Sequence, residues 1–115
     1  MAITQAFLLD AVTIGSSEVS ILSGTTSLQT NTDDGVYFLF VDASAMQKGD
    51  EFIIRVYEKV KSTGTKRVCF DATLSDQQSQ NFLIPGILLI HGWDMTIQKV
   101  AGTDRAFDAS IRKVA

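Results

Sequence analysis

Hydrophobic and polar residues alternate along much of this chain, which is the pattern of half-buried β-strands. The clearest alternation runs through residues 51–57 and resumes over residues 67–74, after a Ser-Thr-Gly-Thr turn signal at residues 62–65. We therefore predict a β-hairpin over residues 51–74.

Other segments supply the remaining predicted strands. Residues 36–41 are apolar at every position, which predicts a central strand covered on both faces. Alternation over residues 93–98 and 107–111 predicts two further strands. The stretch 81–90 contains Pro85, which cannot donate to a strand ladder, so it suits an edge strand, a bulge or a strand boundary.

Two segments depart from the alternating pattern. Residues 42–50 start with a cap-like Asp and have a Gly near their end, which predicts a short helical turn. Residues 1–30 are rich in Ser and Thr and are broken into short apolar pieces. They predict an extended N-terminal arm or two or three short peripheral strands.

The predicted fold class is all-β, because no window shows the 3.6-residue period of a substantial helix. About seven short strands predict a single small β-sandwich, immunoglobulin-like or jelly-roll-like, with an extended N-terminal arm. A sandwich is favoured over a small barrel because residues 36–41 require cover on both faces. We expect one structural domain, with the arm or peripheral strands at residues 1–30 and the sandwich at residues 31–115.

Composition narrows the classes of function. A chain of 115 residues with 45% hydrophobic content can bury one real core, and its net charge of -3 predicts neither nucleic acid nor membrane as a partner. Residues 1–47 carry five acidic and no basic side chains, whereas residues 48–115 carry ten basic and eight acidic ones. This layout needs no purpose in a monomer, or it could pair one copy's acidic segment with a neighbour's basic face.

The sequence predicts neither a signal peptide nor a membrane-spanning segment. Met1–Gly15 contains no Lys or Arg, so we expect no secretory signal. The most apolar stretch, residues 82–90, is shorter than the roughly 20 residues that a membrane-spanning helix needs. An unpaired Cys69 agrees with synthesis in a reducing cytoplasm.

Two side chains could support catalysis. His91 is the only imidazole, and Asp94 could orient it in a hydrolase triad, but no Gly-x-Ser-x-Gly elbow marks a nucleophile. Cys69 has Arg67 as a neighbour that could lower its pKa, yet the chain offers no resolving cysteine. A strand-end histidine and an inert strand cysteine are the simpler interpretations, so we expect no catalytic residues and no enzymatic activity.

Two groups of residues could bind a ligand. The segment Asn31–Gly35 clusters oxygen atoms that could bind calcium, but its spacing differs from an EF-hand loop and is typical of a turn. Trp93, Tyr37 and Tyr57 could line a sugar-binding face, although strand aromatics more often pack in a core. No phosphate-binding or dinucleotide motif is present, and we expect neither a metal nor a cofactor.

A family resemblance rests on six segments spread over residues 32–115: Thr32–Tyr37, Lys48–Phe52, Arg55–Val60, Ile87–Trp93, Lys99–Arg105 and Ser110–Val114. In their overall pattern they resemble the capsid decoration, or cement, proteins of tailed bacteriophages. The resemblance implies a β-rich fold on the capsid surface of the virion, after synthesis in the host bacterial cytoplasm. It also implies a homo-oligomer with the major capsid protein as its partner, and it carries no catalytic residues.

The predicted function is therefore to decorate and stabilise an icosahedral capsid by bridging major capsid subunits. An N-terminal arm could pair with an adjacent chain by strand addition. The candidate contact residues are Ala2, Ile3, Phe7, Leu8 and Leu9. Two alternatives stay open: a carbohydrate- or receptor-binding module of a phage tail or baseplate, and a small hydrolase that depends on His91.

Overall fold

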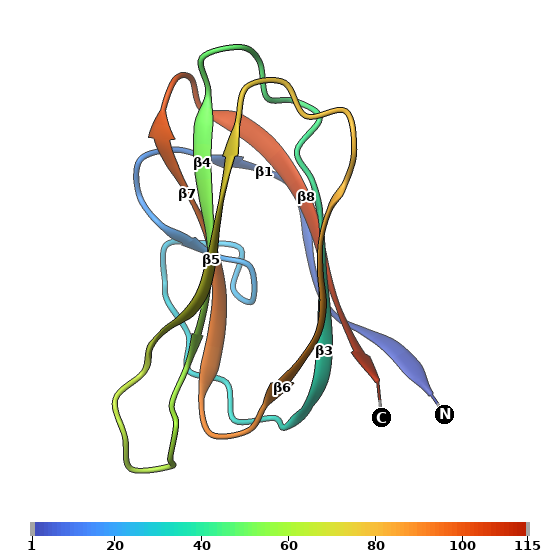
Figure 1. Ribbon diagram of the computed structural model, residues 1–115, viewed down its shortest axis with the longest axis vertical. Coiled ribbons are helices and arrows are strands. Elements are labelled where there is room, and N and C mark those ends of the chain that lie inside the picture. Colours follow the sequence, from blue (N-terminus) through green and yellow to red (C-terminus); the bar gives the residue numbers. More distant parts are fainter. Residues whose placement is uncertain (1, 115) are drawn as a thin grey trace.

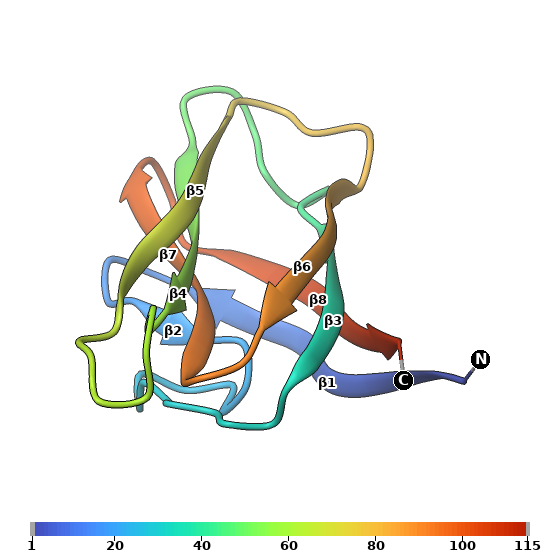
Figure 2. The same cartoon turned by 60° about the horizontal axis from the view of Figure 1, so that its bottom comes forward.

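The computed structural model describes residues 2–114, and within this range it contains eight strands and no helix. The strands are β1 (Ile3–Ile14), β2 (Val19–Ser20), β3 (Gly35–Asp42), β4 (Glu51–Glu58), β5 (Arg67–Ser75), β6 (Phe82–Leu89), β7 (Trp93–Ala101) and β8 (Arg105–Val114). They form two antiparallel sheets that face each other, sheet A in the order β1-β8-β3-β6 and sheet B in the order β2-β7-β4-β5 (Figures 1 and 2). The predicted all-β class is confirmed, and the arrangement is consistent with a small β-sandwich.

The strands predicted by alternation are present. β4 and β5 form the predicted hairpin, with Glu51 opposite Ser75. The two predicted C-terminal strands lie within β7 and β8, which belong to different sheets. β6 is an edge strand, and its ladder with β3 is irregular at Pro85 and Gly86, as expected where a residue cannot donate.

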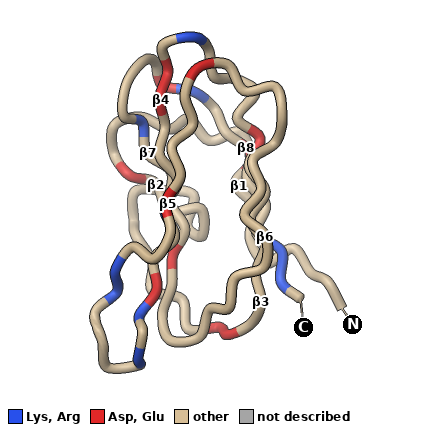
Figure 3. The backbone as a smooth tube through the Cα atoms, viewed as in Figure 1, with Lys and Arg blue, Asp and Glu red and all other residues tan. Residues whose placement is uncertain are grey.

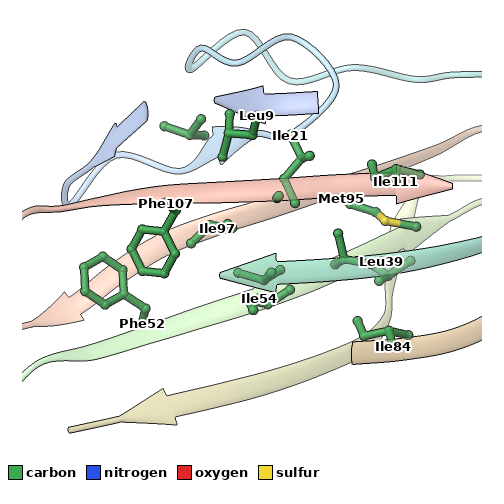
Figure 4. Close-up of a cluster of buried hydrophobic side chains, with 14 of the residues drawn as sticks. Leu9, Ile21, Leu39, Phe52, Ile54, Ile84, Met95, Ile97, Phe107 and Ile111 are labelled. Carbon is green, nitrogen blue, oxygen red and sulfur yellow. The ribbon is translucent and has the colours of Figure 1, made fainter. Parts of the chain in front are cut away.

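The core lies between the two sheets and comes from alternate positions of the strands. On β4, the fully buried side chains are Phe52, Ile54 and Val56. They face side chains from sheet A. The ring centroids of Phe52 and Phe107 are 4.7 Å apart, and the rings are in an edge-on contact (Figure 4). Burial of apolar area stabilises this packing at about 25 cal/mol per Å².

β3 is buried on one face only, so the predicted cover on both faces is wrong. Its inward side chains are fully buried: Tyr37, Leu39 and Val41. Its outward side chains remain partly exposed: Val36, Phe38 and Phe40. The apolar run is continuous because β3 contributes to the core on one side and to an apolar outer surface on the other.

Residues 43–50 form two successive β-turns, so the helical turn predicted over residues 42–50 is wrong. The turns are closed by the hydrogen bonds from Met46 N to Ala43 O and from Asp50 N to Gln47 O, both 3.0 Å long. The segment carries the chain from sheet A to sheet B, and the side chain of Met46 is fully buried on the way. The two β-turns connect the sheets and allow the Met46 side chain to reach the core.

The N-terminal segment lies at the edges of both sheets. Ile3–Ile14 forms β1, which pairs with β8 from Ile3 opposite Val114 to Ile14 opposite Arg105, and Val19–Ser20 forms β2 beside β7. An extended N-terminal arm is not shown. Within residues 2–114 there is no helix with the length and apolar character to span a membrane.

Asp50 joins the β3–β4 loop to the turn between β7 and β8. Its side chain is 2% exposed, and its carboxylate accepts hydrogen bonds from Thr103 N (3.0 Å), Gln47 N (2.9 Å) and Arg105 Nε (2.7 Å). These donors lower the pKa of Asp50 to about 2, and the Thr103 amide has the largest effect.

We expect the free energy of unfolding to fall as the pH is lowered from about 4 to about 2, in part because of Asp50. In that range the unfolded chain binds a proton at Asp50, whereas the folded chain holds the carboxylate ionised. The variant Asp50→Asn should flatten this part of the profile, measured by urea unfolding at several pH values. Asp71→Asn, on the exposed part of β5, is the control and should keep the wild-type slope; identical slopes for both variants would contradict the assignment.

Candidate functional site

The outer face of sheet A carries many exposed apolar side chains. We define it by ten residues from all four strands: Ile3, Leu8, Val36, Phe38, Phe40, Leu83, Leu88, Ser110, Arg112 and Val114. Leu88 is 74% exposed and Ile3 is 67% exposed. An open hollow of about 470 Å³ lies on this face, with Phe38 and Phe40 in its lining. Contiguous apolar surfaces of this kind mark sites of protein interaction.

The register of the ladders brings these side chains into rows across the sheet. Paired residues of antiparallel strands point to the same face. One row contains Ile3, Val114, Val36 and Leu88. A parallel row contains Leu8, Ser110, Phe40 and Leu83. Residues far apart in sequence therefore build one continuous surface.

The outer face of sheet A also carries a defined pattern of charge. The guanidinium of Arg112 stacks on the ring of Phe40 at 3.9 Å, and its Nε donates to Ser110 Oγ (3.2 Å). Beyond Ser110, Asp108 and Asp42 lie opposite each other on β8 and β3. β6 contains no charged residue, as the tan tube in Figure 3 shows.

The predicted contact segment is divided between this face and the core. Ala2, Ile3 and Leu8 are exposed, the latter two on the outer face of sheet A. Phe7 is partly buried, with its ring edge-on to Trp93 at 6.0 Å, and Leu9 is 1% exposed. Contact through this segment stays a prediction, and only its exposed side chains are accessible to a partner.

Most of the face was missed by the sequence analysis. Its other residues come from β3, β6 and β8, and the signal was the continuous apolar character of residues 36–41 and 82–90. That signal is ambiguous, because a strand covered on both sides has the same sequence pattern as a strand with an apolar outer surface.

His91 and Asp94 are not joined in a catalytic arrangement. The Asp94 carboxylate is buried and accepts hydrogen bonds from Ser20 Oγ (2.7 Å), Gln29 N (2.8 Å) and Met95 N (2.9 Å). Burial raises the pKa of Asp94, and these donors oppose that effect. Asp94 thus holds the segment before β3 against β7.

The turn that contains His91 is held through its backbone. The carboxylate of Glu58 accepts hydrogen bonds from the amides of Ile90 (2.8 Å), His91 (3.3 Å) and Gly92 (3.1 Å). A charged acceptor for three successive amides fixes the connection between β6 and β7. The imidazole has no part in these bonds.

Cys69 lies on the edge strand β5. Its Sγ donates to Val56 O at 3.3 Å. Partial burial, followed by the negative charge of Glu58, raises the pKa of the Cys69 thiol. An activated nucleophile requires the opposite shift, so the geometry favours the protonated, unreactive form.

The segment Asn31–Gly35 forms a turn whose oxygen atoms are used within the protein. Asn31 Oδ1 accepts from Asp33 N (2.7 Å), and the Asp33 carboxylate accepts from Tyr37 Oη (2.9 Å) and Lys113 Nζ (3.1 Å). Within residues 2–114 no three His, Cys, Asp or Glu side chains gather in a way that could hold a metal ion.

The three candidate sugar-binding aromatics do not share a surface. Trp93 and Tyr37 are fully buried and pack with their ring centres 4.5 Å apart. Tyr57 donates through its hydroxyl to the Glu18 carboxylate (2.7 Å), and its pKa is raised to about 12 by burial and by this bond. Packing in the core, the preferred interpretation, is confirmed for Trp93 and Tyr37, and the three aromatics form no common sugar-binding face.

Glu18 is a structural centre that the sequence analysis did not find. Its carboxylate accepts from Thr96 Oγ1, Tyr57 Oη and Arg55 Nη1. Although burial alone would raise the pKa of Glu18, these bonds lower it overall. The partners come from β7 and β4, so Glu18 fixes the segment before β2 on the outside of sheet B.

The uneven charge layout is used in part within one chain. Glu18 pairs with Arg55, and Asp33 pairs with Lys113. Each pair joins an acidic residue of the first 47 positions to a basic residue of the remainder. Being partly exposed, such pairs contribute little stability.

No known protein family and no curated protein matches this sequence. By its geometry it is a two-sheet antiparallel β-protein with a largely apolar outer face on sheet A.

Proposed function

We propose that this protein is a virion structural protein that decorates an icosahedral bacteriophage capsid and stabilises it by bridging major capsid subunits. The observation that carries the proposal is the uncovered apolar outer face of sheet A, which has the properties of a protein-binding surface. The resemblance over residues 32–115 supplies the identity of the assembly.

The order of the strands supports this assignment. We place the sandwich among the jelly rolls, in preference to an immunoglobulin-like fold, because its two sheets have the orders β1-β8-β3-β6 and β2-β7-β4-β5. Jelly rolls occur in viral capsid proteins and also in lectins. The fold alone thus fits both a virion protein and a carbohydrate-binding module.

A second exposed segment gives the protein the two contacts that bridging needs. The loop between β4 and β5 extends beyond the body of the sandwich and carries Lys59, Lys61 and Lys66 (Figures 1 and 3). Val60 at this loop is 94% exposed. A basic projection suits an acidic region of a partner surface.

A carbohydrate-binding function has less support. It was based on Trp93, Tyr37 and Tyr57, of which the first two lie in the core. The strands of sheet B provide no other group of aromatic side chains that could bind a sugar in their place.

Purified protein should bind expanded heads of the phage that encodes it, at a fixed copy number, and raise their resistance to heat. A ligand that binds only the assembled shell increases the free energy of its disassembly. Copy number is measured by co-sedimentation, and resistance by the temperature at which the heads open.

Leu83→Asp should reduce this protection, because it places a charge in the apolar face. Leu28→Asp is the matched control, since both leucines are 46% exposed and only Leu83 lies on that face. Absence of the chain from purified heads, or glycan binding in its place on an array, would contradict the proposal.

A further inference from the structure

The hollow on the outer face of sheet A combines an apolar floor with one charged side chain. Its volume is about 470 Å³, and Arg112 is the charged residue in its lining. The apolar lining comes from β1, β3 and β8: Ile3, Val36, Phe38, Phe40 and Val114. Mostly apolar walls with a few polar groups, around a volume of about 300–1,000 Å³, are typical of binding sites. The hollow can therefore take more than one apolar side chain of a partner.

Arg112 is fixed beside this hollow and keeps hydrogen-bond donors free. The central carbon of its guanidinium lies 3.9 Å from the ring centre of Phe40, and its Nε donates to Ser110 Oγ (3.2 Å). Within residues 2–114, its Nη1 and Nη2 have neither a hydrogen-bond partner nor an ion-pair partner. These two nitrogens can donate parallel hydrogen bonds to a single carboxylate.

Two carboxylates of the same face do not neutralise this cation. Asp42 and Asp108 line a second hollow of about 160 Å³ together with Arg112. Asp108 Oδ1 accepts from Ala11 N (2.6 Å), and Asp42 Oδ1 accepts from Ser44 N (2.9 Å). Backbone amides thus hold both acidic side chains, and neither forms an ion pair with Arg112. The guanidinium is left for a carboxylate from outside the chain.

The chemistry of Arg112 restricts what can cover the hollow. A cover removes water from the guanidinium, and a buried cation without a counter-charge is strongly unfavourable. A carboxylate that accepts from Nη1 and Nη2 removes this penalty and adds a charge-assisted contact. Arg is also among the residues that contribute most to the binding energy of protein interfaces. The occupant must therefore combine apolar groups for the floor with a carboxylate for Arg112.

The positions of the lining residues set the spacing of these groups. Val36, Phe38 and Phe40 point to this face from alternate positions of β3 and span roughly 13 Å. The guanidinium of Arg112 lies over the last of the three. In an extended segment, alternate side chains share a face and are also roughly 7 Å apart. Two apolar residues and one acidic residue at alternate positions would match the three residues of β3 in turn.

We propose that this hollow binds an extended segment of the major capsid subunit in which two apolar side chains and a carboxylate occupy alternate positions, with the carboxylate paired to Arg112. The inference rests on the proposed function, because its occupant is the capsid subunit that we propose as the partner of this face. It adds the chemistry by which that partner is recognised, and it makes Arg112 the residue that selects for an acidic partner.

Matched peptides test this recognition without phage heads. The probes are acetyl-Leu-Ser-Leu-Ser-Asp-amide and the same peptide with Asn in place of Asp, each also made in the reverse order. In one of the two orders, the Asp peptide should bind the full chain with a dissociation constant at least about fivefold lower than the Asn peptide, because only its carboxylate is charged. An NMR titration measures both constants, and the backbone amides that shift should be those of β3 and β8.

Variants of Arg112 assign the preference to its guanidinium. Arg112→Gln should abolish the preference and leave the affinity for the Asn peptide within about twofold of wild type. Arg112→Lys keeps the charge but cannot donate to both oxygens in a fixed geometry, so it should keep only part of the preference. Arg67→Gln is the control, at an exposed position on β5 of the opposite sheet, and should leave the preference unchanged. The dispersion of each NMR spectrum establishes that the variant is folded.

Three results would overturn the inference: no binding of any peptide at about 10 mM, equal constants for the Asp and Asn peptides, or a preference that Arg112→Gln retains. Binding of the wild-type chain to phage heads is measured separately. Binding to heads without a peptide preference leaves the proposed function standing and rejects the inference. A preference that depends on Arg112, without binding to heads, supports the recognition of an apolar and acidic segment and rejects capsid decoration.

Discussion

Replacing Trp93 with alanine should lower the free energy of unfolding by about 3–5 kcal/mol. The indole is fully buried and contacts the rings of Tyr37 and Phe7, so one side chain links β7 to β3 and β1. Its Nε1 donates to Asp33 O (3.0 Å), and the Trp93 backbone exchanges two hydrogen bonds with Asn31. The alanine variant loses the packing and leaves a cavity at the junction of both sheets.

Urea unfolding followed by circular dichroism measures this effect, because Trp93 is the only tryptophan and its fluorescence is lost with it. Phe70→Ala is the control: that ring is 46% exposed on the edge strand β5, and its removal should cost less than about 1 kcal/mol. Trp93→Phe should fall between the two, since it keeps aromatic packing and loses the N–H donor. Equal losses for Trp93→Ala and Phe70→Ala would show that the indole does not hold the sheets together.

Gly102→Ala should destabilise the protein by about 3 kcal/mol or more, although it adds a single methyl group. Gly102 has a φ of 93°, which strains any other residue. A Cβ at this position would lie 2.2 Å from Asp50 Oδ1 and 2.7 Å from Asp50 Cα. The carboxylate would have to move away from Thr103 and Arg105, and the connection between the sheets would loosen.

Gly49→Ala separates backbone strain from this clash. Gly49 has nearly the same φ, 92°, but a Cβ there would meet nothing within 4 Å. We expect it to cost about 1–2 kcal/mol, the strain alone. Both variants are compared by urea unfolding at neutral pH. Identical losses would mean that the space around Asp50 is not limiting.

The hairpin over residues 51–74 was predictable because a period of two is a local property of extended backbone. The turns of the segment 42–50 were not predictable in this way, since Asp is common both at the start of a helix and in a turn. In the structure the Asp42 carboxylate accepts from Ser44 N (2.9 Å), and the Asp50 carboxylate reaches Thr103 and Arg105, more than 50 positions away. The partner of a polar side chain is decided by the fold around it.

In the candidate site, too, some features could be predicted from the sequence and others depended on the fold. Ile3 and Leu8 were predicted as contact residues, but the face to which they belong depends on the pairing of β1 with β8 and of β8 with β3. No pattern within a short window encodes those partners. His91 and Asp94, close in sequence, have separate structural roles because Asp94 turns inward to Ser20 and Gln29.

The amino-acid order alone was enough to predict the hairpin over residues 51–74, the C-terminal strands and an all-β class, since these follow from neighbouring residues and the geometry of an extended chain. The assignment of each strand to a sheet came from pairing between distant segments, such as Ile3 with Val114. That pairing placed one apolar surface in the core and left another uncovered on sheet A. Apolar residues of β3 contribute to both surfaces, and the position of the second sheet decides which of them are buried.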